Sequence, residues 1–499
     1  MLIDRASGIL LHLTSLPGAF GAGDFGTDAY KFVDWLVSAG QTRWQVLPLG
    51  EIGPGNSPFM SGSAFAGNIL LIDLAELASH GWLVHEDLTP HPKFCADRAN
   101  FMLMRPFRME RLHRAAESFF TSCPDKMHRA YDEFCAAESE WLEDYALFMT
   151  ISERESWREW SHWPKEIKYR DPQKLYHLKK NCAGEIGFWK FCQWCFARQW
   201  SRLKRYANER GICIIGDMPI FVAYQSADVW SHQELFELDG NGRPSVVAGV
   251  PPDYFSETGQ LWGNPLYRWD VHKETGYAWW VARLRQALRQ ADLVRVDHFR
   301  GFAAYWEIPA DAPNAISGKW ESGPGEKLFE AFEQKFPHLP IIAEDLGLIT
   351  PDVLELRDKF KLPGMRILQF AFGDGVGNPF LPHNYVTNTI AYTGTHDNDT
   401  SIGWWSTVPD HEKTFARQYL GIDNDGEKIG WAMMHALSKS VANTVIFPMQ
   451  DVLGLSGEHR MNYPGHPIGN WEWRFSWDMV KPEHAEALVE MSVEYGRKG

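Results

Sequence analysis

Short apolar runs rich in β-branched residues alternate with amphipathic stretches along most of this chain. Short apolar runs bounded by turn residues are typical of parallel strands buried on both faces, and apolar positions spaced three and four apart, as at 27–39 and 351–360, predict helices. Eight strand–helix repeats predict an α/β fold, the (β/α)8 TIM barrel. The expected strands are residues 8–13, 43–48, 211–217, 293–299, 340–345, 364–370, 388–395 and 443–450.

Two gaps between expected strands are long enough to hold insertions. The first, 75–205, lies after strand two and has helical periodicity, so we expect an inserted helical subdomain. The second, 221–270, lies after strand three and is rich in Gly, Pro, Asp and Tyr, which indicates a loop-rich lid or substrate loop. Residues 1–499 are expected to form a single catalytic barrel with no C-terminal β-sandwich domain, because too few residues follow the last strand.

Composition narrows the class of protein. Hydrophobic residues make up 44% and charged residues 23% of the chain, which is typical of a globular protein with a sizeable core. A net charge of −15 argues against binding to nucleic acid or to anionic membranes, and no apolar run is long enough to span a bilayer. Seven scattered cysteines without the spacing of a disulfide scaffold favour a cytoplasmic location.

Acidic residues stand where four of the expected strands end, at Asp217, Asp297, Glu344 and Asp397. Barrel enzymes build their active sites at these carboxyl ends, so the four side chains should share one mouth. Each acid alone could instead cap a helix or join a structural ion pair. Four of them at one rim favour catalysis.

The pattern fits a retaining glycosidase mechanism. Arg295 and Asp297 lie two residues apart and therefore face the same side of a strand, so the guanidinium can keep the carboxylate ionised, as a nucleophile requires. Glu344, one strand away, could approach within the about 5–5.5 Å used by retaining enzymes, with its pKa raised by the neighbouring acids. Asp397 beside His396 could bind sugar hydroxyls in the transition state. The choice between Glu344 and Asp345 depends on the strand register, and both a packing role and a sugar contact stay open for His298.

Nine motifs in one order carry a resemblance that covers almost the whole chain. They are TSLPG at 14–18, SAFAGN at 63–68, GDMPIFV at 216–222, PPDYF at 251–255, QLWGNP at 260–265, RVDHFRG at 295–301, AEDLG at 343–347, THDNDT at 395–400 and RMNYPG at 460–465. The chain resembles the 4-α-glucanotransferases of glycoside hydrolase family 77, also called amylomaltases or disproportionating enzymes. The resemblance implies transfer of α-1,4-glucan segments between maltooligosaccharides through a covalent glycosyl-Asp297 intermediate. We expect no cofactor, and we expect no metal ion because no close cluster of His, Cys or acidic residues has ligand spacing; an oxygen-ligated calcium site formed by distant loops stays open.

The resemblance also implies roles for individual residues. Asp297 would be the nucleophile, Glu344 the general acid/base and Asp397 the transition-state stabiliser. A loop with Tyr254, Gln260 and Trp262 would cover the acceptor side, and Ser57 and Phe59 would lie at the donor sugar, with Phe59 where the family usually has tyrosine. The implied glucose contacts are Asp217, Arg295, Asp374, His396 and Asn462.

The sequence also offers three alternatives to glucan transfer. Residues 21–26 read G-x-G-x-x-G, as in nicotinamide-dependent oxidoreductases, but the second strand ends in Pro48, Leu49 and Gly50 rather than in the acid that binds ribose. An α-amylase-like retaining hydrolase would use the same carboxylates, with water as the attacking group. A glucan-binding protein without activity would be expected to lack one of the carboxylates. The Cys192 and Cys195 pair lies in a helical stretch and is expected to be core rather than a zinc site.

Overall fold

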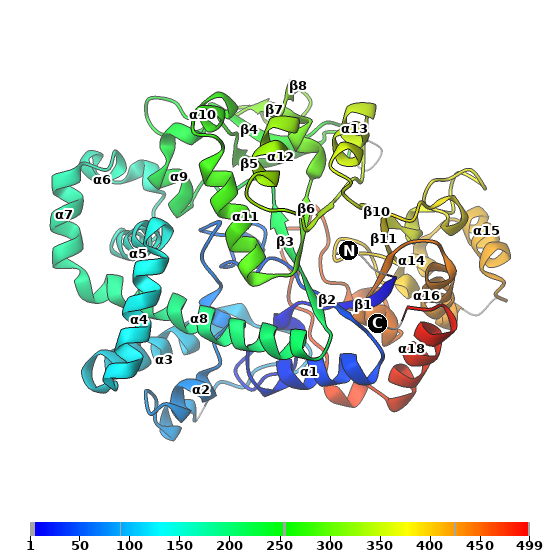
Figure 1. The fold of residues 1–499 in the computed structure, drawn as a ribbon, viewed down its shortest axis with the longest axis horizontal. Helices are drawn as coiled ribbons and strands as arrows, with labels where there is room; N and C mark the ends of the chain where they lie inside the picture. Colours follow the sequence, from blue (N-terminus) through cyan, green and yellow to red (C-terminus); the bar gives the residue numbers. More distant parts are fainter. Residues whose placement is uncertain (1–4, 90, 253–255, 424–425, 498–499) are drawn as a thin grey trace.

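The computed structural model describes residues 5–89, 91–252, 256–423 and 426–497, and it contains the predicted barrel (Figure 1). All eight expected strands are present, and neighbours in the order β10-β11-β12-β1-β2-β3-β6-β9 pair in parallel. Their bounds are β1 (Ala6–Leu10), β2 (Arg43–Gln45), β3 (Cys213–Pro219), β6 (Leu293–Asp297), β9 (Ile341–Ala343), β10 (Gly364–Ile367), β11 (Thr389–Tyr392) and β12 (Thr444–Pro448). The fold class is therefore confirmed.

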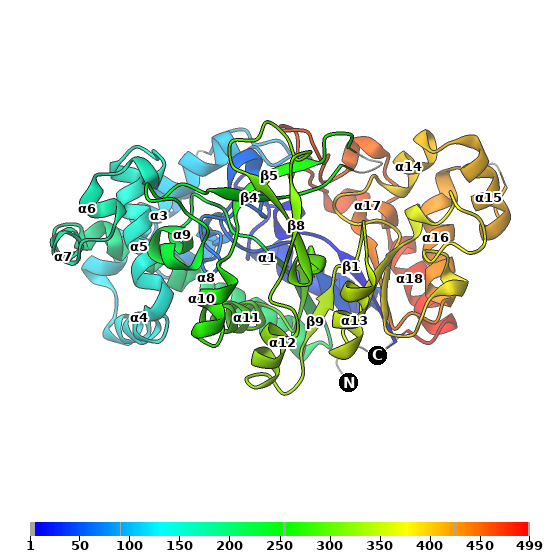
Figure 2. The same cartoon turned by 90° about the horizontal axis from the view of Figure 1, so that it is seen from above.

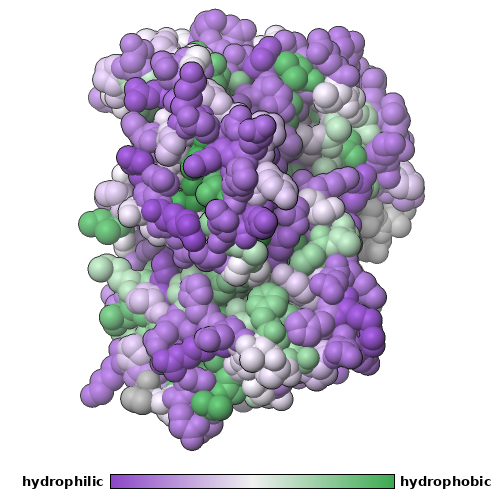
Figure 3. Space-filling view, turned by 90° about the vertical axis from the view of Figure 1, so that its left-hand side faces the viewer, coloured by the Kyte–Doolittle hydropathy of each residue, from purple (hydrophilic) through white to green (hydrophobic). Residues whose placement is uncertain are grey.

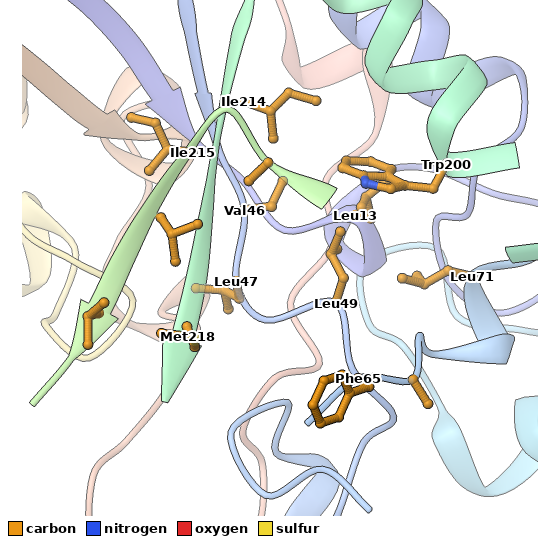
Figure 4. Close-up of a cluster of buried hydrophobic side chains, with 14 of the residues drawn as sticks. Leu13, Val46, Leu47, Leu49, Phe65, Leu71, Trp200, Ile214, Ile215 and Met218 are labelled. Carbon is orange, nitrogen blue, oxygen red and sulfur yellow. The ribbon is translucent and has the colours of Figure 1, made fainter. Parts of the chain in front are cut away.

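The ring of strands closes between β9 and β10. The backbone N–H of Ala343 donates to the carbonyl of Pro363, directly before β10, at 2.9 Å. Inside and around the ring the strand residues are almost all buried. Figure 4 shows part of this core, where Ile214 and Ile215 lie on opposite sides of β3 and Val46, Leu47 and Met218 are packed nearby.

Helices surround the ring, and the sequence explains their limits. In α1 the buried residues Ala29, Phe32, Val33 and Leu36 fall on one face, as the apolar spacing predicts. Helix α13 starts with Pro351. Proline suits this position, because the first N–H groups of a helix have no partner within the helix and proline has no N–H. The helices outside the insertions are α1 (Thr27–Ser38), α11 (Ala278–Gln290), α12 (Glu326–Glu333), α13 (Pro351–Lys359), α14 (Ser401–Thr407), α15 (Asp410–Leu420), α16 (Ile429–Lys439), α17 (Met449–Val452) and α18 (Pro482–Glu494).

The segment between β2 and β3 is helical, as expected, and projects to the left of the barrel in Figure 1. Aromatic rings from different helices hold it together, with Phe119 of α3 packed against Phe191 and Trp194 of α8 at centroid distances of 5.1 and 5.2 Å. The limits 75–205 for an independent subdomain stay a prediction. The helices are α2 (Leu74–Ser79), α3 (Phe101–Ser122), α4 (Asp125–Ala137), α5 (Ser139–Arg154), α6 (Lys165–Lys168), α7 (Pro172–Asn181) and α8 (Ala183–Glu209).

The segment after β3 contains more regular structure than the loop-rich lid that we expected. Besides α9 (Ala227–Ser231) and α10 (Trp269–Glu274), it forms β4 (Val246–Val250) and β5 (Gln260–Pro265). These strands join β7 (Ala304–Pro309) and β8 (Lys319–Ser322) in an antiparallel sheet of order β5-β4-β7-β8, seen above the barrel strands in Figure 2. The short strands contain Gly and Pro and do not alternate clearly, so the sequence pattern did not predict them.

The surface over the inserted helices is mostly hydrophilic, with scattered apolar residues (Figure 3). In the described part of the chain, no helix combines the length and the apolar composition that crossing a membrane requires.

Candidate active site

The four predicted acids lie at the carboxyl ends of their strands. Asp217 lies near the end of β3, Asp297 is the last residue of β6, Glu344 follows β9, and Asp397 follows β11. Because these strands are parallel members of one ring, the acids face the same mouth of the barrel.

Arg295 joins two of these acids. Its Nη1 donates to both carboxylate oxygens of Asp217 at 2.8 and 2.7 Å, and its Nη2 donates to Oδ1 of Asp297 at 2.8 Å. The side chains of Asp217 and Arg295 are buried, whereas that of Asp297 is 30% exposed. Burial raises the pKa of Asp217 to about 6, although Arg295 opposes this shift. Asp297 is thus the acid of this network that a ligand can reach.

Glu344 lies in a different environment, because backbone amides rather than cations contact it. Its Oε2 accepts from the N–H of His298 at 2.7 Å, and its Oε1 accepts from the N–H of Leu346 at 2.8 Å. Burial raises the pKa of Glu344 to about 7; Arg295 opposes the shift and the charge of Asp297 adds to it. The sequence predicts that the neighbouring acids raise this pKa, but burial is the larger cause of the shift.

His298 breaks the alternation of its strand. Its φ of 53° lies in the left-handed region, which ends β6 and turns the His298 amide toward Glu344. The imidazole is buried, which lowers its pKa to about 3, and it meets the ring of Trp262 edge-on at 4.8 Å. His298 therefore contributes its backbone to the Glu344 site and its side chain to the packing beneath Trp262.

Asp345 points away from the mouth into a cluster of cations. It pairs with Arg357 of α13 and Arg366 of β10, and its Oδ1 accepts from the N–H of Met365 at 2.6 Å. The register therefore places Glu344, and not Asp345, at the mouth.

Asp397 is held by three polar groups. His396 approaches its Oδ2 at 3.3 Å, Asn462 donates to Oδ1 at 2.7 Å, and Arg460 donates to its backbone carbonyl at 2.8 Å. The side chain of Asp397 is 47% exposed at the mouth. Partial desolvation would raise its pKa, but His396 and Asn462 outweigh this effect and hold the pKa below its ordinary value. Asp397 also raises the pKa of His396 against the effect of burial. An ionised acid at this position can accept hydrogen bonds from sugar hydroxyls.

Two aromatic rings pack beside His396. Phe59 lies nearly parallel to the imidazole, with centroids 5.0 Å apart, and Trp471 lies 5.7 Å from Phe59. Ser57 accepts the N–H of Phe59 at 3.2 Å, which fixes the turn that carries the ring. Phe59 is partly exposed. The structure thus brings Phe59 and Ser57 next to the His396–Asp397 pair.

The other predicted contacts are placed less closely together. Gln260 is exposed on β5 and accepts from Trp262 Nε1 at 3.1 Å, and Asp374 is exposed in the loop between β10 and β11. Tyr254 lies outside the described residues. The sugar contacts of all three stay predictions.

Sequence reasoning assigned no role at the mouth to His12, Arg460 or Trp471. His12 follows β1, is buried, and lines a small cavity together with His396. A search for every polar residue at a strand end, rather than for acids alone, would have found it. The buried ring of Trp471 packs at the mouth, against Phe59 and His396.

The two motifs that suggested other chemistry have packing explanations. In residues 21–26, Gly23 has no room for a side chain, since a Cβ would lie 2.1 Å from the carbonyl of Leu13. Arg108 of α3 fills the space beside this loop and pairs with Asp24 at 2.8 Å. Cys192 and Cys195 are free and buried in α8. Among the described residues, no group of three or more His, Cys, Asp or Glu side chains is placed to hold a metal ion.

Three comparisons relate the chain to known proteins. A family model described as 4-alpha-glucanotransferase, Glyco_hydro_77, matches residues 11–480. The chain is 51% identical to the 4-alpha-glucanotransferase of Thermus thermophilus over 99% of both chains, and 45% identical to that of Synechocystis over 100% of this chain and 99% of the relative. The amylomaltase of Streptococcus agalactiae, solved in complex with acarbose, is 39% identical and superposes with a TM-score of 0.96 over 99% of this chain and 100% of its own.

Proposed function

The chain belongs to the 4-alpha-glucanotransferase family, glycoside hydrolase family 77, and from this premise we propose the role of each residue at the barrel mouth. The protein is a glycosyltransferase that acts on α-1,4-glucans by the double displacement typical of the family. The observation that supports the assignment best is a contrast between two carboxylates. Asp297 accepts a hydrogen bond from a guanidinium, whereas Glu344 is buried and, among the described residues, accepts hydrogen bonds from backbone amides.

Asp297 is the nucleophile. An oxygen of its carboxylate attacks the anomeric carbon of the donor, and the glycosidic C–O bond breaks. Arg295 supports this role, because its positive charge favours the ionised carboxylate and fixes its orientation. The same guanidinium holds Asp217, which we propose contacts hydroxyls of the same glucose ring.

Glu344 is the general acid and then the general base. A pKa of about 7 lets it carry a proton near neutral pH, so it can give that proton to the departing glycosidic oxygen. In the second step it accepts a proton from the hydroxyl of an acceptor glucan, whose oxygen attacks the anomeric carbon and releases Asp297.

Asp397, His396 and Asn462 stabilise the transition state. The low pKa of Asp397 keeps the carboxylate charged, and Asn462 and His396 fix its position. We propose that Asp397 and His396 bind hydroxyls of the distorted donor ring, with Ser57 and Phe59 beside that ring and Asp374 as a further contact. Tyr254, Gln260 and Trp262 would cover the acceptor, where excluding water favours transfer over hydrolysis.

The substrates are maltooligosaccharides, and we also infer a cytoplasmic location. All seven cysteines are free thiols, three of them buried in the helical insertion, which fits a reducing compartment.

Incubation of the purified protein with maltotriose alone tests the function. We expect a ladder of longer glucans plus glucose, and no ladder from the Asp297→Asn variant, which keeps the size of the side chain and loses its nucleophilic charge. Glucose and maltose without longer products would show a hydrolase instead. A ladder from Asp297→Asn equal to that of the wild type would refute the nucleophile.

A further inference from the structure

A second hollow lies on the outside of the barrel, away from the mouth. Its volume is about 410 Å³, and residues of α4, α5, α9 and α11 line it, so it lies between the helical insertion and a barrel helix. Figures 1 and 2 show where these helices lie. None of the proposed catalytic residues lines it. We refer to it as the α5–α11 pocket.

Aromatic rings form one wall of the α5–α11 pocket. Trp141 of α5 is partly exposed and lies nearly parallel to Phe65, with centroids 6.3 Å apart and planes at 15°. Phe65 in turn meets Trp279 of α11 edge-on at 5.9 Å. Flat rings with an exposed face suit ligands that present C–H groups on one side and hydroxyls at their edge.

The indole N–H of Trp279 supports a polar ligand. The residue is more than nine-tenths buried, and within the described residues its Nε1 has no hydrogen-bond partner. Buried donors in native proteins are almost always satisfied, by protein, water or ligand. Trp279 lines the pocket but its Nε1 is itself buried, so a small movement of the indole would let a hydroxyl of a bound molecule accept this hydrogen bond.

The charges around the α5–α11 pocket argue against an anionic ligand. Acidic residues outnumber arginines in its lining, and the two kinds are interspersed. Glu138 accepts from Trp141 Nε1 at 2.8 Å and also pairs with Arg289, so the ring that would contact a ligand is fixed in place. The acids are Glu138, Glu140, Asp144, Asp228 and Glu234, and the arginines are Arg285 and Arg289.

We propose that the α5–α11 pocket is a second binding site for α-1,4-glucan, which holds part of a long chain on Trp141 and Trp279 outside the active site. A neutral polyhydroxyl ligand matches the rings, the unpaired indole donor and the mixed carboxylate, amide and guanidinium groups. The proposal rests on the proposed function for its ligand class. Two sites on one protein raise the effective concentration of a long glucan near the mouth, whereas maltotriose is too short to benefit.

Native gel electrophoresis in the presence of soluble amylose tests binding directly. All proteins carry Asp297→Asn, so that amylose is not consumed. Trp141→Ala is expected to reduce retardation by amylose at least about twofold, and Trp141→Phe, which keeps a ring, should restore most of it. Trp157→Ala is the matched control, because Trp157 is an exposed tryptophan in the same insertion that does not line the pocket.

Kinetics separate this site from the active site. In the otherwise wild-type enzyme, Trp141→Ala should raise the KM for amylose about fivefold to tenfold, with glucose as acceptor, and leave kcat/KM for maltotriose unchanged. Thermal unfolding of each variant checks that the fold is kept. If Trp141→Ala unfolds, the KM for amylose and the kcat/KM for maltotriose are measured on Trp141→Phe instead.

Two results would overturn the proposal: retardation of Trp141→Ala equal to that of Trp157→Ala, or equal losses with amylose and maltotriose. Neither result depends on whether the protein transfers glucan, since failure of the proposed function would instead appear as a wild-type enzyme that forms no ladder from maltotriose.

Discussion

Glu344 and Asp345 are neighbours in the chain and opposites in their surroundings. Both follow β9, but alternation sends Glu344 to the barrel mouth and Asp345 toward β10 and α13. Two amide N–H groups contact Glu344, whereas two guanidinium groups and one amide contact Asp345. We call the second arrangement the Asp345 cluster.

The comparison shows how one fold makes one acid reactive and another structural. In the Asp345 cluster, Gly364 lets β10 approach closely, because a Cβ there would lie 2.5 Å from Asp345 Oδ2. The carboxylate is thus locked between fixed cations. Glu344 is also buried, but among the described residues no cation lies at contact distance from it. Burial raises its pKa to about 7, so the side chain can exchange a proton near neutral pH, and its ionised form destabilises the fold.

Glu344→Gln should produce the largest change, a loss of activity. The amide keeps the size of the side chain but can neither give nor take the proton, so kcat for maltotriose should fall about 10²–10⁴-fold. Rates of glucose release and of ladder formation measure this effect. Full activity of the variant would disprove the acid/base role.

The stability of the same variant should change in the opposite direction. The folded-state pKa of Glu344 lies above its ordinary value, so the wild type loses stability as pH rises from about 4.5 to about 7, where the unfolded chain ionises first. Glu344→Gln removes this loss. Its Tm relative to the wild type should therefore be higher at pH 8 than at pH 5, and a Tm difference that does not change with pH would contradict the burial argument.

Asp345→Asn should have the reverse effect, a loss of stability with a smaller effect on chemistry. It leaves Arg357 and Arg366 without their shared carboxylate, which should cost about 3 kcal/mol of unfolding free energy. Urea denaturation measures the loss. Asp358→Asn is the matched control, because Asp358 also pairs with Arg357 but is exposed, and it should cost less than about 1 kcal/mol. Equal losses in the two variants would show that the Asp345 cluster does not stabilise the protein.

Sequence reasoning went furthest where periodicity and strand ends carry the information. All eight barrel strands were predicted, and the acids at four strand ends come together at the mouth. The choice between Glu344 and Asp345 needed the register of β9, which three strand residues cannot show. The left-handed backbone of His298, which supplies a donor to Glu344, has no sequence signal, because non-glycine residues rarely adopt it.

The second sheet and the ring stack at the mouth were missed for another reason. Strand β5 pairs with β4, and β4 pairs with β7, which follows the next barrel strand, so this sheet depends on distant pairing and not on a local pattern. Trp471 reaches Phe59 and His396 from the far end of the chain. Contacts between segments distant in sequence are not visible in the spacing of residues.

Phe59→Tyr should produce the smallest change, at the mouth and without altering any charge. The ring already stacks on His396 at 5.0 Å and is partly exposed, so an added hydroxyl can reach a bound donor without disturbing the packing. One further hydrogen bond to a sugar would raise kcat/KM for maltotriose about twofold to tenfold. The matched control is Phe120→Tyr on α3, an exposed phenylalanine of the insertion, which should change nothing. If Phe59→Tyr shows no gain while Phe59→Ala loses activity, the ring contacts the donor through its face alone; if neither variant changes kcat/KM, Phe59 does not lie at the donor ring.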